Sequence, residues 1–179
     1  ALALFALGAA QGAVGWLMVK SRLVDRPSVS HYRLALHLAV AVTIFGFSVW
    51  LARGLAIRSP RAEWRPGGRR TVRRWLVIVG ALLALQIVWG ALVAGMKAGL
   101  LLGTFPLMAG RLLPPSWLAL DPVLVNFVQN PATVQWVHRL LGTALLSSAV
   151  VFVLRLGRVE PDRATRRLGV ALLELVATQ

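Results

Sequence analysis

Four long apolar stretches with almost no charge dominate the chain and predict four membrane-crossing helices. They span residues 1–19, 34–52, 75–96 and 133–154. Each is close to the roughly 20 residues that a helix needs to cross a hydrocarbon core about 30 Å thick. No stretch alternates apolar and polar positions with a period of two, so helices are favoured over barrel strands. A fifth apolar run, residues 168–179, would extend only about 18 Å as a helix and is too short to cross.

The composition supports a membrane protein and excludes several other classes. Of the 179 residues, 58% are hydrophobic and 15% are charged, whereas a soluble domain is usually about 25% charged. A nucleic-acid-binding protein would explain the net charge of +14 but not so much apolar sequence. The absence of Cys excludes a secreted disulfide scaffold, a zinc–thiolate site and an iron–sulfur site. We therefore expect an all-α fold, a polytopic transmembrane helical bundle.

The basic residues indicate how the bundle is oriented. Thirteen lie in segments 53–74 and 155–167, and six lie in segments 20–33 and 97–132. By the positive-inside tendency, the first two segments face the cytoplasm and the other two face outward. The arginine run within 69–74 could instead bind anionic lipid or nucleic acid, but the topological interpretation is favoured.

Segment 97–132 is long for a connection between packed helices. It contains five prolines and three glycines, which forbid a continuous helix. Its many apolar residues favour a position on the membrane surface. Composition alone leaves two alternatives: a lid over a site near the outer face, or a packed connector without a ligand.

Two histidines, His37 and His138, lie inside the predicted helices at similar depth from the outer face. Ionisable residues at membrane depth are costly and normally face the protein interior. A neutral imidazole without a nearby carboxylate or thiolate suits the axial position of a haem iron. The alternative, that each ring only hydrogen-bonds a neighbouring helix, is about equally favoured. We expect His31, which precedes the second predicted helix, to lie at the interface.

The neighbours of these histidines are compatible with a haem. Arg33 lies one turn before His37 on the same helix face, where it would contact a haem propionate or extend to the interface. Gly142 lies one turn after His138 and would leave space for a flat macrocycle. Arg139 points about 100° away from His138, toward another helix or an adjacent propionate.

Other motifs are few. Gln11 and Gly15, four residues apart, recur as Gln86 and Gly90, a weak indication of duplicated architecture. The sequence shows no glycine-rich phosphate loop, no Ser-His-Asp set and no paired intramembrane carboxylates. Catalysis would therefore depend largely on a bound cofactor, and no catalytic residue is predicted.

Five stretches in order along nearly the whole chain resemble haem A synthase of the proteobacterial and mitochondrial type, which lacks the outward-loop cysteine pair. They are residues 11–21 (QGAVGWLMVKS), 29–38 (VSHYRLALHL), 90–99 (GALVAGMKAG), 104–111 (TFPLMAGR) and 134–142 (VQWVHRLLG). Two positions depart from the family pattern: Leu102-Gly103 replaces the usual Tyr-Asn, and Ala109 replaces a common Asp.

The resemblance implies part of an eight-helix enzyme made of two four-helix halves, each binding one haem between two histidines. Residues 1–52 would be the last two helices of the N-terminal half, and 53–74 a basic cytoplasmic loop. Residues 75–179 would begin the C-terminal half, with two full spans and a truncated third. His37 would be an axial ligand of the substrate haem O, and His138 an axial ligand of a haem b cofactor.

The implied reaction oxidises the C8 methyl group of haem O to a formyl group, giving haem A for cytochrome c oxidase. The enzyme would be a haem-dependent oxidoreductase of the bacterial inner membrane. Its expected partners are lipid, haem O, haem A, haem O synthase and oxidase assembly factors, with no nucleic acid. The remaining two axial ligands and the catalytic acid would lie outside residues 1–179, so this fragment alone is expected to be inactive. Two alternatives are a b-type electron-transfer cytochrome and a haem-free transport or assembly subunit.

Overall fold

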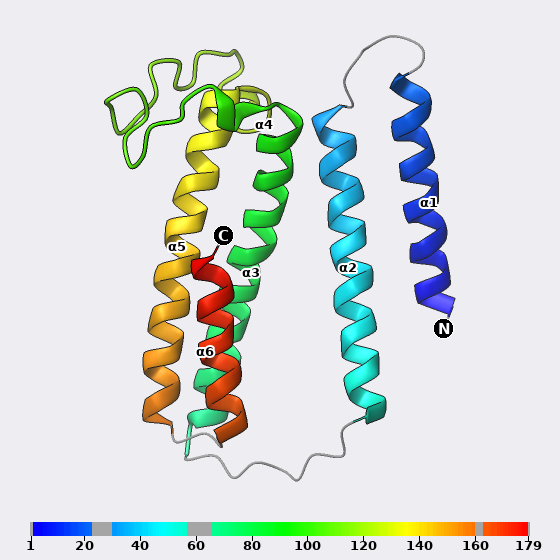
Figure 1. The fold of residues 1–179 in the computed structure, drawn as a ribbon, viewed down its shortest axis with the longest axis vertical. Coiled ribbons are helices and arrows are strands. Elements are labelled where there is room, and N and C mark those ends of the chain that lie inside the picture. The colour runs from blue at the N-terminus through cyan, green and yellow to red at the C-terminus, as the bar shows by residue number, and fades with distance from the viewer. Residues whose placement is uncertain (1, 23–29, 57–65, 160–162, 179) are drawn as a thin grey trace. The chain divides into compact units, whose positions relative to one another are not determined.

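The computed structural model describes residues 2–22, 30–56, 66–159 and 163–178 (Figure 1). The regular elements in these ranges are all helical, which confirms the all-α prediction. Their bounds are α1 Leu2–Arg22, α2 His31–Ala56, α3 Gly68–Gly95, η1 Ala98–Leu100, η2 Val123–Val125, α4 Asn126–Gln129, α5 Pro131–Arg158 and α6 Arg163–Ala177.

Four of these helices are long and apolar enough to cross a membrane: α1, α2, α3 and α5. Each contains most or all of one predicted apolar stretch, so the chain is a multi-pass membrane protein, as predicted. Helix α6, which contains most of the fifth apolar run, has 15 residues. It is about 22 Å long at 1.5 Å per residue, which is shorter than a hydrocarbon core.

The helices extend into the segment predicted as a basic loop, 53–74. Helix α2 continues to Ala56 and α3 begins at Gly68, seven residues before the apolar stretch starts; residues 57–65 lie outside the described part of the chain. Arginine is a good helix former, and its long side chain reaches water or headgroups from a helical backbone. Charge therefore marks where the apolar span ends but not where the helix ends.

Two compact units divide the chain. The first comprises Ala1–Ile57 with Ile87–Arg139, and the second comprises Arg58–Gln86 with Leu140–Gln179. In the first unit α1 and α2 pack side by side and antiparallel (Figure 1). Because the unit boundaries cut through α3 and α5, they do not coincide with the predicted halves, and the assignment of 1–52 and 75–179 to those halves stays a prediction.

The second unit has a small apolar core between the first part of α3, the second part of α5, and α6. Partly buried side chains of α6 pack against it, and its buried members are Val72, Val79, Leu145, Phe152 and Leu156. Helix α6 approaches α5 closely at Gly169, where an added Cβ would lie 2.6 Å from Leu156 Cδ2. Glycine at this position lets the two helices touch.

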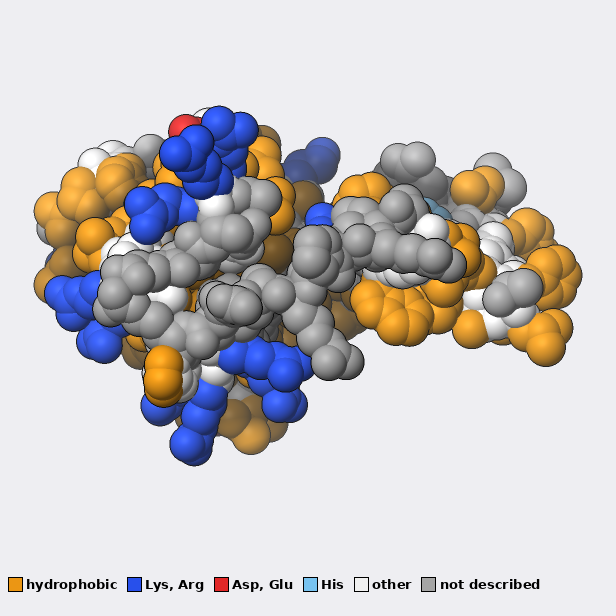
Figure 2. Space-filling view, turned by 90° about the horizontal axis from the view of Figure 1, so that it is seen from below, with side chains coloured by type: hydrophobic (Ala, Val, Ile, Leu, Met, Phe, Trp, Pro, Cys, Tyr) orange, Lys and Arg blue, Asp and Glu red, His pale blue; other side chains and the backbone are white. Residues whose placement is uncertain are grey.

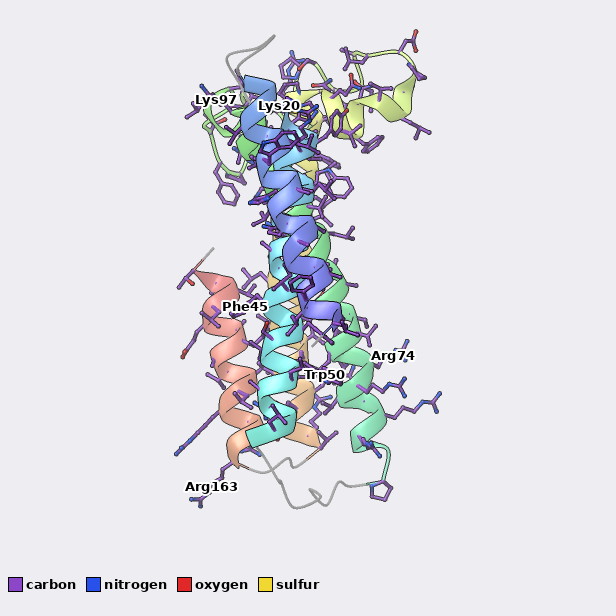
Figure 3. The ribbon with its side chains drawn as sticks, turned by 90° about the vertical axis from the view of Figure 1, so that its right-hand side faces the viewer. Lys20, Phe45, Trp50, Arg74, Lys97 and Arg163 are labelled. Atoms are coloured by element: carbon purple, nitrogen blue, oxygen red, sulfur yellow. The ribbon has the colours of Figure 1, made fainter. Side chains whose placement is uncertain are left out.

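The outer surfaces of the helices carry apolar side chains, as a lipid-facing surface requires. On α2, for example, Phe45 is 70% exposed and Trp50 is 67% exposed (Figure 3). Basic side chains gather instead at one end of the second unit (Figure 2). Arg163 begins α6, and Arg74 lies within the first two turns of α3 (Figure 3). This distribution is the one expected where the apolar spans end.

Candidate functional site

His37 lies six residues after the start of α2, and its ring contacts α1 at two positions one turn apart. The amide nitrogen of Gln11 is 3.2 Å from His37 Nε2. At Gly15, an added Cβ would lie 3.4 Å from His37 Cε1 and 3.9 Å from Nδ1. The imidazole therefore rests directly on the α1 backbone, with its distal nitrogen held by the Gln11 amide.

This contact occupies one nitrogen of the ring. Which of the two groups donates between the Gln11 amide and His37 Nε2 depends on the tautomer of the imidazole. His37 Nδ1 is buried, and no described residue provides it with a hydrogen-bond partner. A haem iron bound through Nε2 would take the place of the Gln11 contact at that nitrogen.

His138 lies seven residues after the start of α5, at nearly the same helical depth as His37. Its ring packs against α3 at Gly90, where an added Cβ would lie 3.1 Å from His138 Cε1 and 3.7 Å from Nδ1. Each of the two histidine rings thus packs against a glycine of another helix. His37 packs against Gly15 of α1, and His138 packs against Gly90 of α3.

Gly142, one turn beyond His138, is in contact with protein. An added Cβ there would lie 3.1 Å from the Gln86 amide nitrogen. The space that the missing side chain leaves beside Gly142 therefore receives the Gln86 amide, and its role beside a macrocycle stays a prediction. Sequence reasoning noticed the repeated Gln–x₃–Gly pattern only as a sign of duplication; the structure shows that its glycines face the histidines.

The two arginines predicted to contact haem propionates hydrogen-bond backbone carbonyls. Arg33 Nη1 donates to Leu17 O at 3.1 Å, which joins the start of α2 to the last turns of α1. Arg139 donates to Leu102 O at 2.7 Å and to Thr104 O at 2.5 Å. Both side chains therefore join their helix to another segment of the chain through hydrogen bonds. Propionate binding stays a prediction for each.

Hydrogen bonds join segment 97–132 to the first turns of α5. Besides Arg139, the Gln135 amide donates to Leu102 O at 3.0 Å, and the Trp136 indole donates to Leu112 O at 2.9 Å. The contact at position 102 uses the backbone carbonyl, so it does not depend on which side chain stands there. These bonds are compatible with both a lid and a connector, and the two interpretations stay predictions.

Two buried asparagines that the sequence interpretation missed organise this segment. Asn126 is fully buried and bonds Leu120 through both its side-chain oxygen and its nitrogen. Asn130 donates to Ser116 O and to Asn126 Oδ1, and its own Oδ1 accepts from the amides of Ala132 and Thr133. The available signal was the Asn130-Pro131 pair, since Asn is favoured at a helix N-cap and Pro at the first helical position.

His31 packs at the junction of α2 and α3. An added Cβ at Gly95 would lie 2.7 Å from the Cα and the Cβ of His31. The start of α2 and the end of α3 therefore approach to backbone contact. His31 is partly buried in this contact, and its position at the membrane interface stays a prediction.

The described residues contain no cluster of three or more His, Cys, Asp or Glu side chains that could hold a bare metal ion. A haem differs because its macrocycle supplies four ligands and the protein supplies only the axial ones. Helix-borne imidazoles without neighbouring acids, each with a glycine beside the ring, fit that requirement.

Comparisons with known proteins identify the family of the chain. The family model COX15-CtaA, described as cytochrome oxidase assembly protein, matches residues 1–179. The chain belongs to this family. Proteins named Heme A synthase from Allorhizobium ampelinum and Rhodospirillum centenum are 42% and 44% identical to it, over 98% and 94% of this chain. A third, from Nitrosospira multiformis, is 40% identical over 95% of the chain.

The matched regions cover 47%, 44% and 47% of those three proteins, so the chain spans about half the length of the curated relatives it matches. No solved structure matches the chain. The family match therefore confirms the resemblance found in the sequence.

Proposed function

We propose that the protein containing this chain is a haem A synthase that oxidises the C8 methyl group of haem O to a formyl group for cytochrome c oxidase. One observation carries the proposal: His37 and His138, at matched helical depth, each rest on a glycine of another helix. The family model that matches residues 1–179 and the relatives named Heme A synthase support the choice of substrate.

In this proposal His37 is an axial ligand of haem O and His138 an axial ligand of a haem b cofactor. The bound haem supplies redox and oxygen chemistry that the side chains of this chain lack. The chain's own contribution would be to orient the two imidazoles and to surround them with apolar helices that exclude water. Arg33 and Arg139, one turn before His37 and one residue after His138, are proposed to interact with haem propionates.

The second axial histidine of each site and the catalytic acid are proposed to lie in the part of the protein outside residues 1–179. The protein is proposed to reside in the bacterial inner membrane, with segments 53–74 and 155–167 cytoplasmic. Haem O synthase and oxidase assembly factors are its proposed protein partners. Placing both histidines near the outer face follows from this orientation.

The test uses full-length protein expressed in cells that contain haem O but make no haem A. We expect haem A to appear in haem extracts only when the protein is present, and to be lost in both His37→Ala and His138→Ala. Thr43→Ala and Ser147→Ala are matched controls, because each hydroxyl bonds only a carbonyl one turn back on its own helix.

The haem content of the purified variants separates the alternatives. A protein that binds haem b through His138 but forms no haem A would be an electron-transfer cytochrome. A correctly folded protein with no Soret band would be a haem-free subunit. Either result would refute the proposed activity.

A further inference from the structure

The rings of His37 and His138 share one kind of contact: each lies against a glycine of another helix. Gly15 of α1 faces the ring of His37, and Gly90 of α3 faces the ring of His138. In both cases the atom nearest to an added Cβ is Cε1 and the next is Nδ1. The same edge of each ring therefore lies on a helix backbone.

We propose that Gly15 and Gly90 are positioning residues that set the rotation of the His37 and His138 imidazoles about their side-chain bonds, and thereby the electronic properties of each haem iron. This inference rests on the proposed function, because it takes both histidines as axial ligands. It goes beyond that function by assigning a role to two residues that are not among the proposed haem ligands.

The distances differ between the two positions. An added Cβ at Gly90 would lie 3.1 Å from His138 Cε1, which requires a displacement of a few tenths of an ångström. At Gly15 the distance to His37 Cε1 is 3.4 Å, at the limit of ordinary van der Waals contact, so alanine there would require less displacement. An α3 or α5 backbone held by its own hydrogen bonds resists that displacement, so the ring, which turns about a single bond, yields first.

The other glycines of these helices have different surroundings. An alanine Cβ at Gly12 of α1 or at Gly80 of α3 would meet nothing within 4 Å. At Gly95 of α3 it would lie 2.7 Å from the Cα and Cβ of His31, a close approach of two helix backbones. At Gly15 and Gly90 the nearest atoms belong instead to an imidazole ring.

At His37 the ring has a second neighbour on α1. The Gln11 amide nitrogen, one turn before Gly15, lies 3.2 Å from His37 Nε2. An iron bound through Nε2 would replace this contact, whereas Gly15 would remain beside the Cε1 edge of the ring. Gly15 is therefore the contact on which the inference rests at His37.

The experiment compares Gly15→Ala and Gly90→Ala with the matched controls Gly12→Ala and Gly80→Ala, all in the full-length protein purified from membranes. Alanine raises helix propensity at every one of these positions, by about 1 kcal/mol, so loss of helix stability does not explain an effect. Ferric low-spin EPR spectra report the orientation of the axial ligand planes, and redox titration gives the midpoint potential of each haem. His37→Ala and His138→Ala assign the two signals.

We expect Gly90→Ala to shift the g values and potential of the His138 haem alone, and Gly15→Ala to shift those of the His37 haem alone and by less. Haem affinity at the altered site should fall by roughly 10- to 100-fold, the range found when a group that orients a metal-bound histidine is removed. The controls should match the wild type.

Unchanged g values, potentials and affinity in both variants would overturn the inference, as would equal shifts in the control variants. If the wild type showed no haem signal that depends on either histidine, the proposed function itself would be refuted, whatever the glycine variants showed. The His→Ala variants therefore separate failure of the function from failure of the glycine contact.

Discussion

Replacing Asn130 with alanine should loosen segment 116–133 without removing any proposed haem ligand. The Asn130 side chain is 5% exposed and makes four hydrogen bonds. Losing the N-cap of α5 costs about 1 kcal/mol. Losing the two bonds donated by its nitrogen costs about 1 kcal/mol each, because Ser116 O keeps a bond from Ala119 N and Asn126 Oδ1 keeps one from Leu120 N.

The total of about 3 kcal/mol corresponds to a roughly 100-fold larger population of the locally opened segment. Amide hydrogen exchange of the full-length protein in detergent measures this directly, with peptides covering residues 116–133. Asn130→Ser should recover part of the effect, about 1 kcal/mol, because serine restores the cap but cannot replace the donated bonds. The exposed neighbour Gln129 provides the control variant Gln129→Ala.

Exchange in this segment that is unchanged in Asn130→Ala, or that rises equally in Gln129→Ala, would refute the reasoning. Either result would mean that the segment is held by its apolar contacts rather than by the asparagine network.

Three other predictions concern packing, topology and completeness. Gly169→Ala should lower the thermal unfolding midpoint, because its Cβ would overlap Leu156 at a cost of roughly 1–3 kcal/mol. The control Gly157→Ala, whose Cβ would meet nothing within 4 Å, should not lower it. Equal midpoints in the two variants would contradict the close approach at Gly169. Because the sequence has no native Cys, single-cysteine variants can be labelled without background: Arg69→Cys should react with an impermeant maleimide only from the cytoplasmic side and Gly103→Cys only from outside, and the reverse pattern would invert the proposed topology. The chain expressed alone should show no bis-histidine haem spectrum, since each proposed site then has one histidine; a low-spin spectrum from the chain alone would show that it completes a site.

The membrane spans were predictable because the signal is local. Each predicted stretch is apolar over the length of a bilayer, and each lies almost entirely within one helix. The errors occur at helix ends such as Gly68, where charged residues continue the helix. Hydropathy marks the limits of the hydrocarbon core, whereas backbone hydrogen bonds decide the limits of the helix.

Segment 97–132 shows where local reasoning stops. Its prolines and glycines exclude a long helix but do not specify what replaces it. The answer depends on bonds between distant positions, such as Arg139 to Leu102 and Trp136 to Leu112. The backbone contacts of Arg139 and Asn130 form only where α5 packs against this segment. The sequence alone therefore did not show these contacts.

By itself the sequence determined the fold class and the four spans, because each follows from composition over one helix; it also predicted His37 and His138 as haem ligands, from their matched depth and the family resemblance. Only the tertiary structure decided what surrounds those histidines. Gln11 and His37 are 26 positions apart, and Gly90 and His138 are further. Which helix lies against an imidazole depends on side-chain packing between helices, and no hydrophobic pattern within a single helix contains that information.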